Sequence, residues 1–450
     1  MKTQKVYDII GIGIGPFNLG MAALAAPIQD LSALFLDQAP AFSWHPGMML
    51  SDATLQVPFM ADLVTMADPT SPYSFLNFMK QTGRLYKFYI REDFYVLRKE
   101  YNAYCKWVIT QLPSCQFNQK VLSSAYNQQE QYYELTVENQ LTFEKQIFYT
   151  RKLVLGTGAS PKTPEFANPA ENPGIVHTAD YLKHKQQLLT HSRVTIIGSG
   201  QSAAEVFSDL LPETENGLQL KWFTRPDRFF PMEYSKLTLE LTSPEYVDYF
   251  FNLPDEKRKQ VLSKQNPLFK GINFSLINQI FDKLYELSVD DADLNVHLSP
   301  NCQLNDISVA ADGAYNLHFY HTEQEQEFVQ QTDFVIMATG YKYKEPSFLK
   351  GINDRIARND DALYKVGRNY SIDISGDEIF VQNAELHTHG FVTPDLGMGA
   401  YRNSAIINTI LGREVYKVEK RIAFQQFGLE EPTVNNHLQT EDNTLTTINL

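Results

Sequence analysis

Residues 6–16 read Val-Tyr-Asp-Ile-Ile-Gly-Ile-Gly-Ile-Gly-Pro, an apolar run that passes into three alternating glycines. The run 6–10 has the composition of a strand buried in a parallel sheet. A small-residue helix is expected over 19–26, and a second apolar run, 33–36, ends at Asp37. A strand, a glycine-rich turn, a helix and a second strand in this order predict a βαβ unit of the dinucleotide-binding type.

The glycines of this turn suit the binding of a pyrophosphate. Gly11 and Gly13 permit a tight turn and a close approach of the backbone, and the helix N-terminus offers free N–H groups and a positive dipole end. Gly15 continues the pattern, whereas Pro16 stands where the simple fingerprint has glycine. The Asp37 carboxylate is placed to hold ribose hydroxyls. A glycine-rich turn without a ligand is the alternative interpretation.

The same arrangement returns in the middle of the chain. The apolar run 193–197 leads into Gly-Ser-Gly-Gln-Ser-Ala at 198–203, a helix is expected over 203–211, and a strand over 220–224 precedes Arg225. An acid at this position would repel the 2′-phosphate of NADPH, whereas arginine attracts it. The second unit is therefore predicted to prefer NADPH over NADH. A solvated surface charge is the alternative interpretation of Arg225.

Composition narrows the class of protein. A net charge of −14 disfavours binding to nucleic acid, because an acidic surface repels phosphate backbones. Three cysteines without a C-x-x-C pair favour a reducing cytoplasm and argue against a disulfide reductase. Glycines and a proline interrupt the apolar stretch 9–28, so we expect neither a signal peptide nor a membrane span. The polar tail after about Gly428 is expected to be frayed.

Two further motifs are interpreted as structural. Ser202 lacks the glycine two residues later that a nucleophile elbow requires. His387 and His389 have no third ligand at a useful spacing, which favours satisfied histidines over a metal site.

Eight separated blocks share a pattern with one enzyme family. They are residues 11–19, 42–48, 55–59, 68–76, 198–203, 270–275, 338–341 and 387–390. These blocks resemble the flavin-dependent N-hydroxylating monooxygenases of siderophore biosynthesis, which act on lysine, ornithine or diamines.

The resemblance implies an α/β fold with two Rossmann-like domains, one for FAD and one for NADPH, and a small helical substrate region. It also implies O₂ and a small amine as reactants, no membrane partner, and assembly into a homo-oligomer, a dimer or a tetramer. We expect the FAD-binding domain at 1–190 and 330–450, the NADPH-binding domain at 191–235 and 290–330, and the helical substrate-binding region at 236–289.

The resemblance further implies a mechanism. NADPH reduces the flavin, O₂ adds at C4a to give a hydroperoxide, and a neutral amine attacks the distal oxygen. The hydroperoxide must be shielded from water. The pKa of a free alkylamine is about 10.4, so the pocket must lower this pKa by desolvation. Catalysis of this kind depends on positioning and on water exclusion rather than on an acid–base side chain.

Residue roles are carried over by position. Gln56 is expected beside the flavin ring, and Asn273 beside both the reacting amine and the nicotinamide ribose. The other cofactor-binding positions expected are Gly11, Gly13, Gly15, Pro16, Asp37, Trp44, His45, Val121, Gly200, Gln201, Ser202, Ala203, Arg225, Phe274, Ser275, Pro394, Asp395 and Leu396.

Three positions depart from the lysine and ornithine hydroxylases. Those enzymes have a lysine, which holds the substrate carboxylate, where this chain has Ala61. They have Asn or Asp at the position of Leu239 and a serine at the position of Gly397. A pocket without these polar groups leaves a carboxylate unpaired. The predicted substrate is therefore a short diamine, putrescine or cadaverine.

The distal ammonium of a diamine requires an acid, and Glu240, Asp395 and Glu385 are the candidates. Histamine also lacks a carboxylate and stays an alternative. L-lysine or L-ornithine stays possible if the three departures are neutral. A nucleotide-binding protein of the same fold without enzymatic activity is the alternative from another class.

Overall fold

The first glycine turn folds as a strand–helix–strand unit at the centre of one sheet. The computed structural model describes residues 5–289 and 294–429, so the tail expected to be frayed lies outside the described residues from 430 onward. Strand β1 (Val6–Ile12) runs parallel to β2 (Ala33–Leu36), with Ile12 opposite Leu36. Helix α1 (Pro16–Ala25) joins them and is buried along almost its whole length. The predicted βαβ unit is confirmed.

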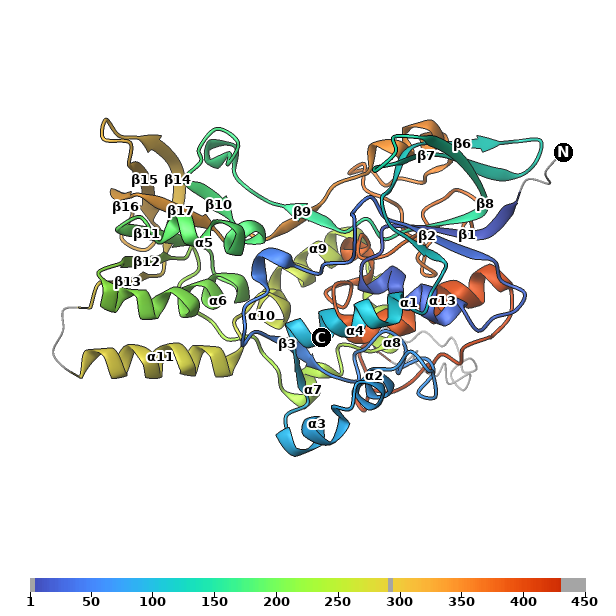
Figure 1. The fold of residues 1–450 in the computed structure, drawn as a ribbon, viewed down its shortest axis with the longest axis horizontal. Coiled ribbons are helices and arrows are strands. Elements are labelled where there is room, and N and C mark those ends of the chain that lie inside the picture. Colours follow the sequence, from blue (N-terminus) through green and yellow to red (C-terminus); the bar gives the residue numbers. More distant parts are fainter. Residues whose placement is uncertain (1–4, 290–293, 430–450) are drawn as a thin grey trace, which may run out of the picture.

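The first sheet has seven strands, and Figure 1 shows it in the part of the molecule that holds the N-terminus. Its order is β5-β2-β1-β8-β7-β6, and β19 also pairs with β8. The strands around β1 are parallel, whereas β6, β7 and β8 form an antiparallel meander. Its other strands are β5 (Cys115–Gln116), β6 (Gln119–Asn127), β7 (Tyr132–Asn139), β8 (Lys145–Leu155) and β19 (Ile379–Val381).

The second sheet carries the second glycine turn. All five strands are parallel, in the order β10-β17-β11-β12-β13. They are β10 (Ile175–His177), β11 (Arg193–Ile197), β12 (Gln219–Phe223), β13 (Val296–Ser299) and β17 (Phe334–Met337). A three-stranded meander follows β13 in the chain, formed by β14 (Cys302–Val309), β15 (Tyr315–His321) and β16 (Gln326–Thr332).

The second sheet extends past the boundaries expected at 191 and 330. Strand β17 lies between β10 and β11, so both β10 and β17 belong to this sheet. The physical reason is that the closing strand after the meander, β17, fills the centre of the sheet, and β10 pairs with it there. These memberships depend on pairing between distant segments, which local patterns do not encode.

Two short segments carry the chain between the sheets. Strand β9 (Ala159–Pro161) pairs antiparallel with β18 (Tyr341–Tyr343). Figure 1 shows β9 within the long segment that links the two parts of the molecule. A further small antiparallel pair is formed by β3 (Thr54–Pro58) and β4 (Tyr95–Leu97). Figure 1 shows β3 below the link.

Helices cover the sheets and build a third region between them. Helix α6 (Gln201–Leu210) packs against the second sheet, and α13 (Gly399–Leu411) packs beside α1. The helical region expected at 236–289 is present as α7 (Lys236–Leu239), α8 (Pro244–Phe251), α9 (Asp255–Lys264), α10 (Asn266–Phe269) and α11 (Phe274–Ser288). The remaining α-helices are α2 (Phe75–Gln81), α3 (Leu85–Arg91), α4 (Arg98–Ile109), α5 (Tyr181–Leu188) and α12 (Leu386–His389).

None of the described helices combines the length and the hydropathy that crossing a bilayer requires. Two aromatic side chains of α8 are buried, and these, Tyr246 and Phe250, form a core with Phe391. This helix is therefore a packing element of the helical region.

Candidate active site

The first glycine turn leaves room for a ligand at the start of α1. Gly13 has φ +90°, and a Cβ there would lie 2.3 Å from the carbonyl oxygen of Gly156. Gly15 is the N-cap residue of α1 and forms no side-chain cap, and nothing lies within 4 Å of the place where its Cβ would be. Backbone N–H groups at this end are therefore available to a phosphate oxygen.

The Asp37 carboxylate lies at the same turn. One oxygen accepts the backbone N–H of Ile14 at 2.7 Å, and the other accepts that of Ala39 at 2.8 Å. An ionised carboxylate has about four lone-pair sites, so two remain for ribose hydroxyls. Val121 lies in β6 with its side chain in the core, two residues from Gln119, whose N–H donates to the Asp37 carbonyl. Its contact with a cofactor stays a prediction.

The second glycine turn has the same form. Gly198 has φ +151°, and its Cβ would lie 2.3 Å from the carbonyl oxygen of Ala338. Gly200 is the N-cap residue of α6, again without a side-chain cap, while Ala203 is buried in the core behind it. Arg225 is exposed just after β12, at the edge of the sheet where this turn lies. Both turns thus fit the phosphates of a dinucleotide.

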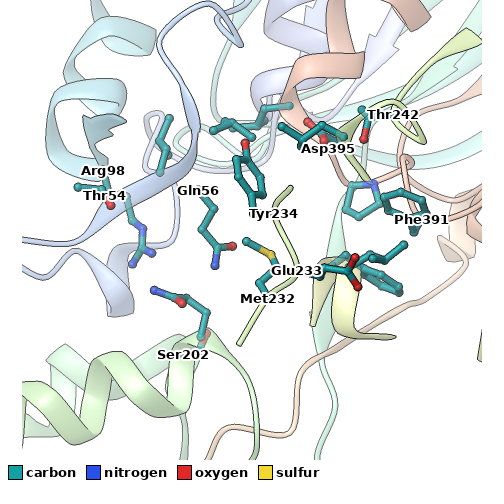
Figure 2. Close-up of a pocket in the computed structure, with 18 of the residues that line it drawn as sticks. Thr54, Gln56, Arg98, Ser202, Met232, Glu233, Tyr234, Thr242, Phe391 and Asp395 are labelled. Atoms are coloured by element: carbon teal, nitrogen blue, oxygen red, sulfur yellow. The ribbon is translucent and has the colours of Figure 1, made fainter. Parts of the chain in front are cut away.

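Two adjoining cavities open where the sheets and the helical region meet. Their volumes are about 320 Å³ and 860 Å³, and both are lined by Gln56, Gln201 and Tyr234. Gln56 extends from β3 toward Ser202 at the start of α6, and Tyr234 lies between Gln56 and Asp395 in this view (Figure 2). A cavity at a meeting point of domains is the usual place for an active site.

The sequence-predicted residues divide between these cavities. The smaller one is lined by Trp44, His45, Gln56, Ser202, Leu239, Pro394, Asp395 and Leu396. The larger one is lined by Asn273, Phe274 and Ser275, again with Gln56 and Gln201. The blocks that are far apart in the chain therefore converge on one place.

Gln56 carries an unsatisfied donor into the cavity. Its Nε2 atom is buried and forms no hydrogen bond among the described residues. Buried polar atoms in folded proteins almost always have a partner, so an orphan atom of this kind points to a missing ligand. A flavin ring, which offers carbonyl oxygens and ring nitrogens along its edge, fits this position.

A polar chain fixes the wall between the cavities. Arg98 forms a buried, bidentate ion pair with Glu205, with N–O distances of 2.7 Å and 2.9 Å. Glu205 accepts the Gln201 amide at 3.0 Å, and the Gln201 carbonyl accepts the backbone N–H of Asn273 at 2.8 Å. The Asn273 side chain caps α11 by accepting the N–H of Ser275. The catalytic candidate Asn273 is therefore held at the mouth of the larger cavity.

His45 is neutral at physiological pH. Burial and the charge of Arg98 lower the pKa of His45 to about 4. Its backbone is left-handed, with φ 49°, and its ring packs against Trp44. A neutral imidazole at a strained position shapes the cavity wall and adds no positive charge to it.

Three acids were candidates for a substrate ammonium, and only Asp395 lines the smaller cavity. Burial raises the pKa of Asp395, and this is opposed by the N–H of Gly397 and the charge of Arg402. That N–H lies 2.6 Å from one carboxylate oxygen. The side chain is partly open to the cavity although it is deeply set among protein atoms.

Glu240 lines neither of the two cavities. Its carboxylate accepts the backbone N–H groups of Phe424 and Gln425, both at 3.0 Å. Leu239 lines the cavity, whereas the carboxylate of Glu240 binds the C-terminal segment. The reason is the helical geometry of α7, in which successive side chains point in different directions.

The carboxylate of Glu385 is also engaged within the protein. It is fully buried and forms an ion pair with Arg402, which is itself fully buried. Its second oxygen accepts the N–H of Ala384. A carboxylate that already neutralises a buried guanidinium is not free to bind a second cation.

Sequence reasoning missed Glu233 among the cavity acids. Its carboxylate accepts the Thr238 hydroxyl at 2.8 Å and lines the smaller cavity near Phe391 (Figure 2). Glu233 and Tyr234 lie in a loop before α7, where no periodicity or motif marks them. Only their closeness in sequence to Leu239 could have suggested a role.

The positions that depart from the lysine and ornithine hydroxylases lie close together. A Cβ on Gly397 would lie 3.8 Å from the Cβ of Ala61 and 3.1 Å from a carboxylate oxygen of Asp395. Leu239 lines the same cavity as Asp395. The place where a lysine would meet a substrate carboxylate is therefore next to a carboxylate of the protein.

The two histidines of the 387–389 segment are satisfied. His387 Nε2 lies 2.8 Å from the carbonyl oxygen of Tyr364, and His389 contacts Thr388 and the Arg368 carbonyl. Within residues 5–289 and 294–429, no three His, Cys, Asp or Glu side chains gather as metal ligands.

A sequence profile of the family described as L-lysine 6-monooxygenase/L-ornithine 5-monooxygenase matches residues 5–343. The chain belongs to this family. Family membership confirms the predicted resemblance, the α/β fold with two Rossmann-like units and the class of enzyme, a flavin-dependent N-monooxygenase.

Individual relatives are similar over nearly the whole chain. The putrescine N-hydroxylase of Shewanella oneidensis is 50% identical over 425 residues, which cover 94% of this chain and 84% of the relative. The putrescine N-hydroxylase of Acinetobacter baumannii is 46% identical over 429 residues, covering 95% of both chains. The FAD-bound crystal structure of the cadaverine monooxygenase of desferrioxamine biosynthesis from Erwinia amylovora has a TM-score of 0.93 and 50% identity, covering 95% of this chain and 100% of that chain.

Proposed function

We propose that this protein uses FAD and NADPH to hydroxylate one nitrogen of a short diamine, putrescine or cadaverine. The balanced reaction is RNH₂ + O₂ + NADPH + H⁺ → RNHOH + H₂O + NADP⁺. NADPH supplies two electrons, one oxygen atom of O₂ enters the N–O bond, and the other leaves as water. The two putrescine N-hydroxylases and the cadaverine monooxygenase support this choice of substrate.

Residues of both glycine turns would hold the cofactors. The turn at Gly13 and Gly15, with Asp37 and Gln56, suits FAD, and the turn at Gly200, with Arg225, suits NADPH. When bound, the flavin supplies the activation of O₂ and the oxygen transfer. The protein supplies position, through Gln56 and Asn273, and exclusion of water.

The charge of the smaller cavity is the observation that carries the diamine proposal. Its lining contains two acids, Asp395 and Glu233, and one guanidinium, that of Arg98. Arg98 is already paired with Glu205, and His45 is neutral. A substrate carboxylate would find no free cation among these residues, whereas an ammonium would find a carboxylate.

Asp395 is the acid that we assign to the distal ammonium. The reacting amine would lie on the Gln56 side, where apolar walls favour the neutral form that attacks oxygen. Leu239, Phe391 and Leu396 contribute to these walls. The two ends of the substrate thus require opposite environments, and the cavity offers both.

The product class points to siderophore assembly. A hydroxylamine is converted into a hydroxamate by acylation, and hydroxamates bind ferric iron. We also propose that the protein works in a reducing cytoplasm, in keeping with the free thiols of Cys105, Cys115 and Cys302, and that it forms a dimer or tetramer. Light scattering on the purified holoenzyme tests the assembly.

The test of the function is NADPH-dependent hydroxylamine formation on putrescine, cadaverine, histamine, L-lysine and L-ornithine. We expect turnover of one or both diamines and little of the amino acids. Efficient turnover of lysine or ornithine alone would refute the diamine proposal. Turnover of histamine alone would identify the substrate as an alkylamine that carries a ring. A protein that binds the cofactors but shows no amine-stimulated NADPH oxidation would not be an enzyme of this class.

A further inference from the structure

Three cationic residues meet at one edge of the second sheet. The five parallel strands of this sheet place their carboxyl ends together, and nucleotides bind at such edges. Arg225 follows β12, and Lys162 is attached to the end of β17, because its N–H donates to the Gly340 carbonyl at 2.9 Å and its own carbonyl accepts the Thr339 hydroxyl.

Lys270 reaches the same edge from the helical region. Its carbonyl oxygen lies 3.2 Å from the place of a Cβ on Gly200, the N-cap residue of α6. The segment after Lys270 is pinned to the chain that follows Arg225. Ile272 donates its N–H to the Phe230 carbonyl at 3.1 Å, and its carbonyl accepts the N–H of Met232 at 2.7 Å.

No described carboxylate neutralises these three cations. Arg225, Lys162 and Lys270 form no ion pair among the residues that the structure describes, although acids outnumber basic residues in the chain by 53 to 39. Burial lowers the pKa of Lys270, and the charges of Lys162 and Arg225 lower it further. Their charges therefore repel one another across a short space, and a polyanion between them would relieve this repulsion.

We propose that Lys162 and Lys270 act together with Arg225 to bind the 2′-phosphate of NADPH. This inference rests on the proposed function, since it takes NADPH as the ligand of the second glycine turn. Arg225 alone is the residue that sequence spacing indicates. The tertiary structure adds one lysine from the link between the sheets and one from the helical region.

The two lysines belong to two different parts of the molecule, and neither lies in the second sheet. Lys162 follows β9, the strand that links the two sheets, and Lys270 lies between α10 and α11, three residues before Asn273. One phosphate group would therefore contact all three parts of the molecule. Binding of NADPH would hold the link and the helical region in a fixed position relative to the second sheet.

Calorimetric titration of the FAD-loaded holoenzyme tests the site with NADP⁺, NAD⁺ and adenosine 2′,5′-bisphosphate as probes. Lys162→Gln and Lys270→Gln should each raise the Kd for NADP⁺ and for the bisphosphate by about 5-fold, as expected for a partly screened contact to a phosphate. The Kd for NAD⁺ should change by less than about 2-fold, because NAD⁺ has no 2′-phosphate. Lys162→Arg and Lys270→Arg should retain the affinity for NADP⁺.

Lys264→Gln, at an exposed lysine at the end of α9, is the matched control and should bind all three probes like the wild type. An unchanged affinity for NADP⁺ in either glutamine variant would show that the replaced lysine does not bind the 2′-phosphate. An equal loss for NADP⁺ and NAD⁺ overturns the assignment to the 2′-phosphate. If the wild type itself does not bind NADP⁺, the proposed function fails, which distinguishes that failure from a failure of the lysine assignment.

Discussion

Under the proposed function, single residues would set the choice of amine. Ala61 and Gly397 leave out the polar groups of the amino-acid hydroxylases, and the space beside them contains the carboxylate of Asp395. A carboxylate repels the carboxylate of lysine or ornithine and attracts the second ammonium of a diamine. One carboxylate would therefore attract the favoured substrate and repel the disfavoured one.

Replacing Asp395 by Asn should raise the KM for putrescine or cadaverine by about 10- to 100-fold, because a hydrogen bond to a charged group contributes about 1.5–3 kcal/mol. A monoamine of similar length should be affected less, since it has no distal ammonium. Steady-state hydroxylamine formation measures both. Glu233→Gln is the comparison variant and should have the smaller effect. A larger increase in KM for Glu233→Gln than for Asp395→Asn would assign the binding of the ammonium to Glu233.

We also expect kcat/KM to depend on pH through the Asp395 carboxyl group. The pKa of Asp395 is raised by burial, so the carboxylate takes up a proton at a higher pH than an exposed aspartate does. Only the ionised form attracts an ammonium, so kcat/KM for the diamine should fall as the pH decreases through this raised pKa. The acidic limb of the profile should be absent in Asp395→Asn, and its persistence there would assign it to another group.

At the scale of elements, the first glycine turn places the start of α1 against the end of β8. Gly13 can take φ +90° and can approach the Gly156 carbonyl because it has no Cβ. No other residue type meets both conditions, so this position depends on glycine for a geometric reason.

Gly13→Ala should give a protein that retains less than about a tenth of the wild-type FAD, because the new methyl group would displace the loop that faces the pyrophosphate. The ratio of flavin to protein absorbance after purification measures the loss. Gly83→Ala is the control, since Gly83 also has a positive φ, +70°, but has open space around its Cβ position. A similar loss of FAD in both variants would attribute the effect to backbone strain alone.

A second element-level feature is the attachment of the C-terminal segment 422–425. Glu240 and Glu245 accept four consecutive backbone N–H groups from this segment. The bonds from Phe424 and Gln425 lower the pKa of Glu240. The contribution of Glu240 to this attachment is therefore complete above the ordinary pKa of a glutamate and is lost only as the pH falls through the lowered pKa.

Glu240→Gln should increase the rate of hydrogen exchange at the amides of Phe424 and Gln425 by about 10-fold, because an amide oxygen accepts more weakly than a carboxylate. Exchange at neutral pH measured by mass spectrometry checks this. The KM for the diamine should stay within about 2-fold of the wild type, since the carboxylate does not line the cavity. A large change in KM with unchanged exchange would return Glu240 to the substrate site.

At the scale of the whole molecule, the active site exists only where three regions meet. The buried ion pair of Arg98 and Glu205 joins α4, beside the first sheet, to α6 of the second. The same Glu205 leads through Gln201 to Asn273 in the helical region. This polar chain fixes the relative position of the parts that carry the two cofactors.

Glu205→Gln should lower the free energy of unfolding by about 3–5 kcal/mol, because it leaves the buried guanidinium of Arg98 without a counter-charge. Urea denaturation of the holoenzyme measures the change. Glu256→Gln, which removes one partner of an exposed ion pair with Lys259, is the control and should leave the unfolding midpoint unchanged. Equal effects in the two variants would show that burial of the Arg98 pair does not matter.

Local sequence patterns suffice to predict the features that neighbouring residues encode. The two glycine turns, their strands and the helical stretch follow from local periodicity and from the conformational freedom of glycine. The structure contains all of them, although helix α1 begins at Pro16 rather than at residue 19 and β1 extends to Ile12. The departures at Ala61, Leu239 and Gly397 could also be read from the chain, because they are changes of residue type within recognisable blocks.

Which side chains share a space depends instead on how distant segments pack together. Leu239 and Glu240 are adjacent in sequence, yet the first lines the cavity and the second binds the C-terminal segment. β10 enters the second sheet only because β17 lies beside it. Such outcomes depend on strand pairing, on the direction of each Cα–Cβ bond and on contacts between segments hundreds of residues apart, and no local pattern contains them.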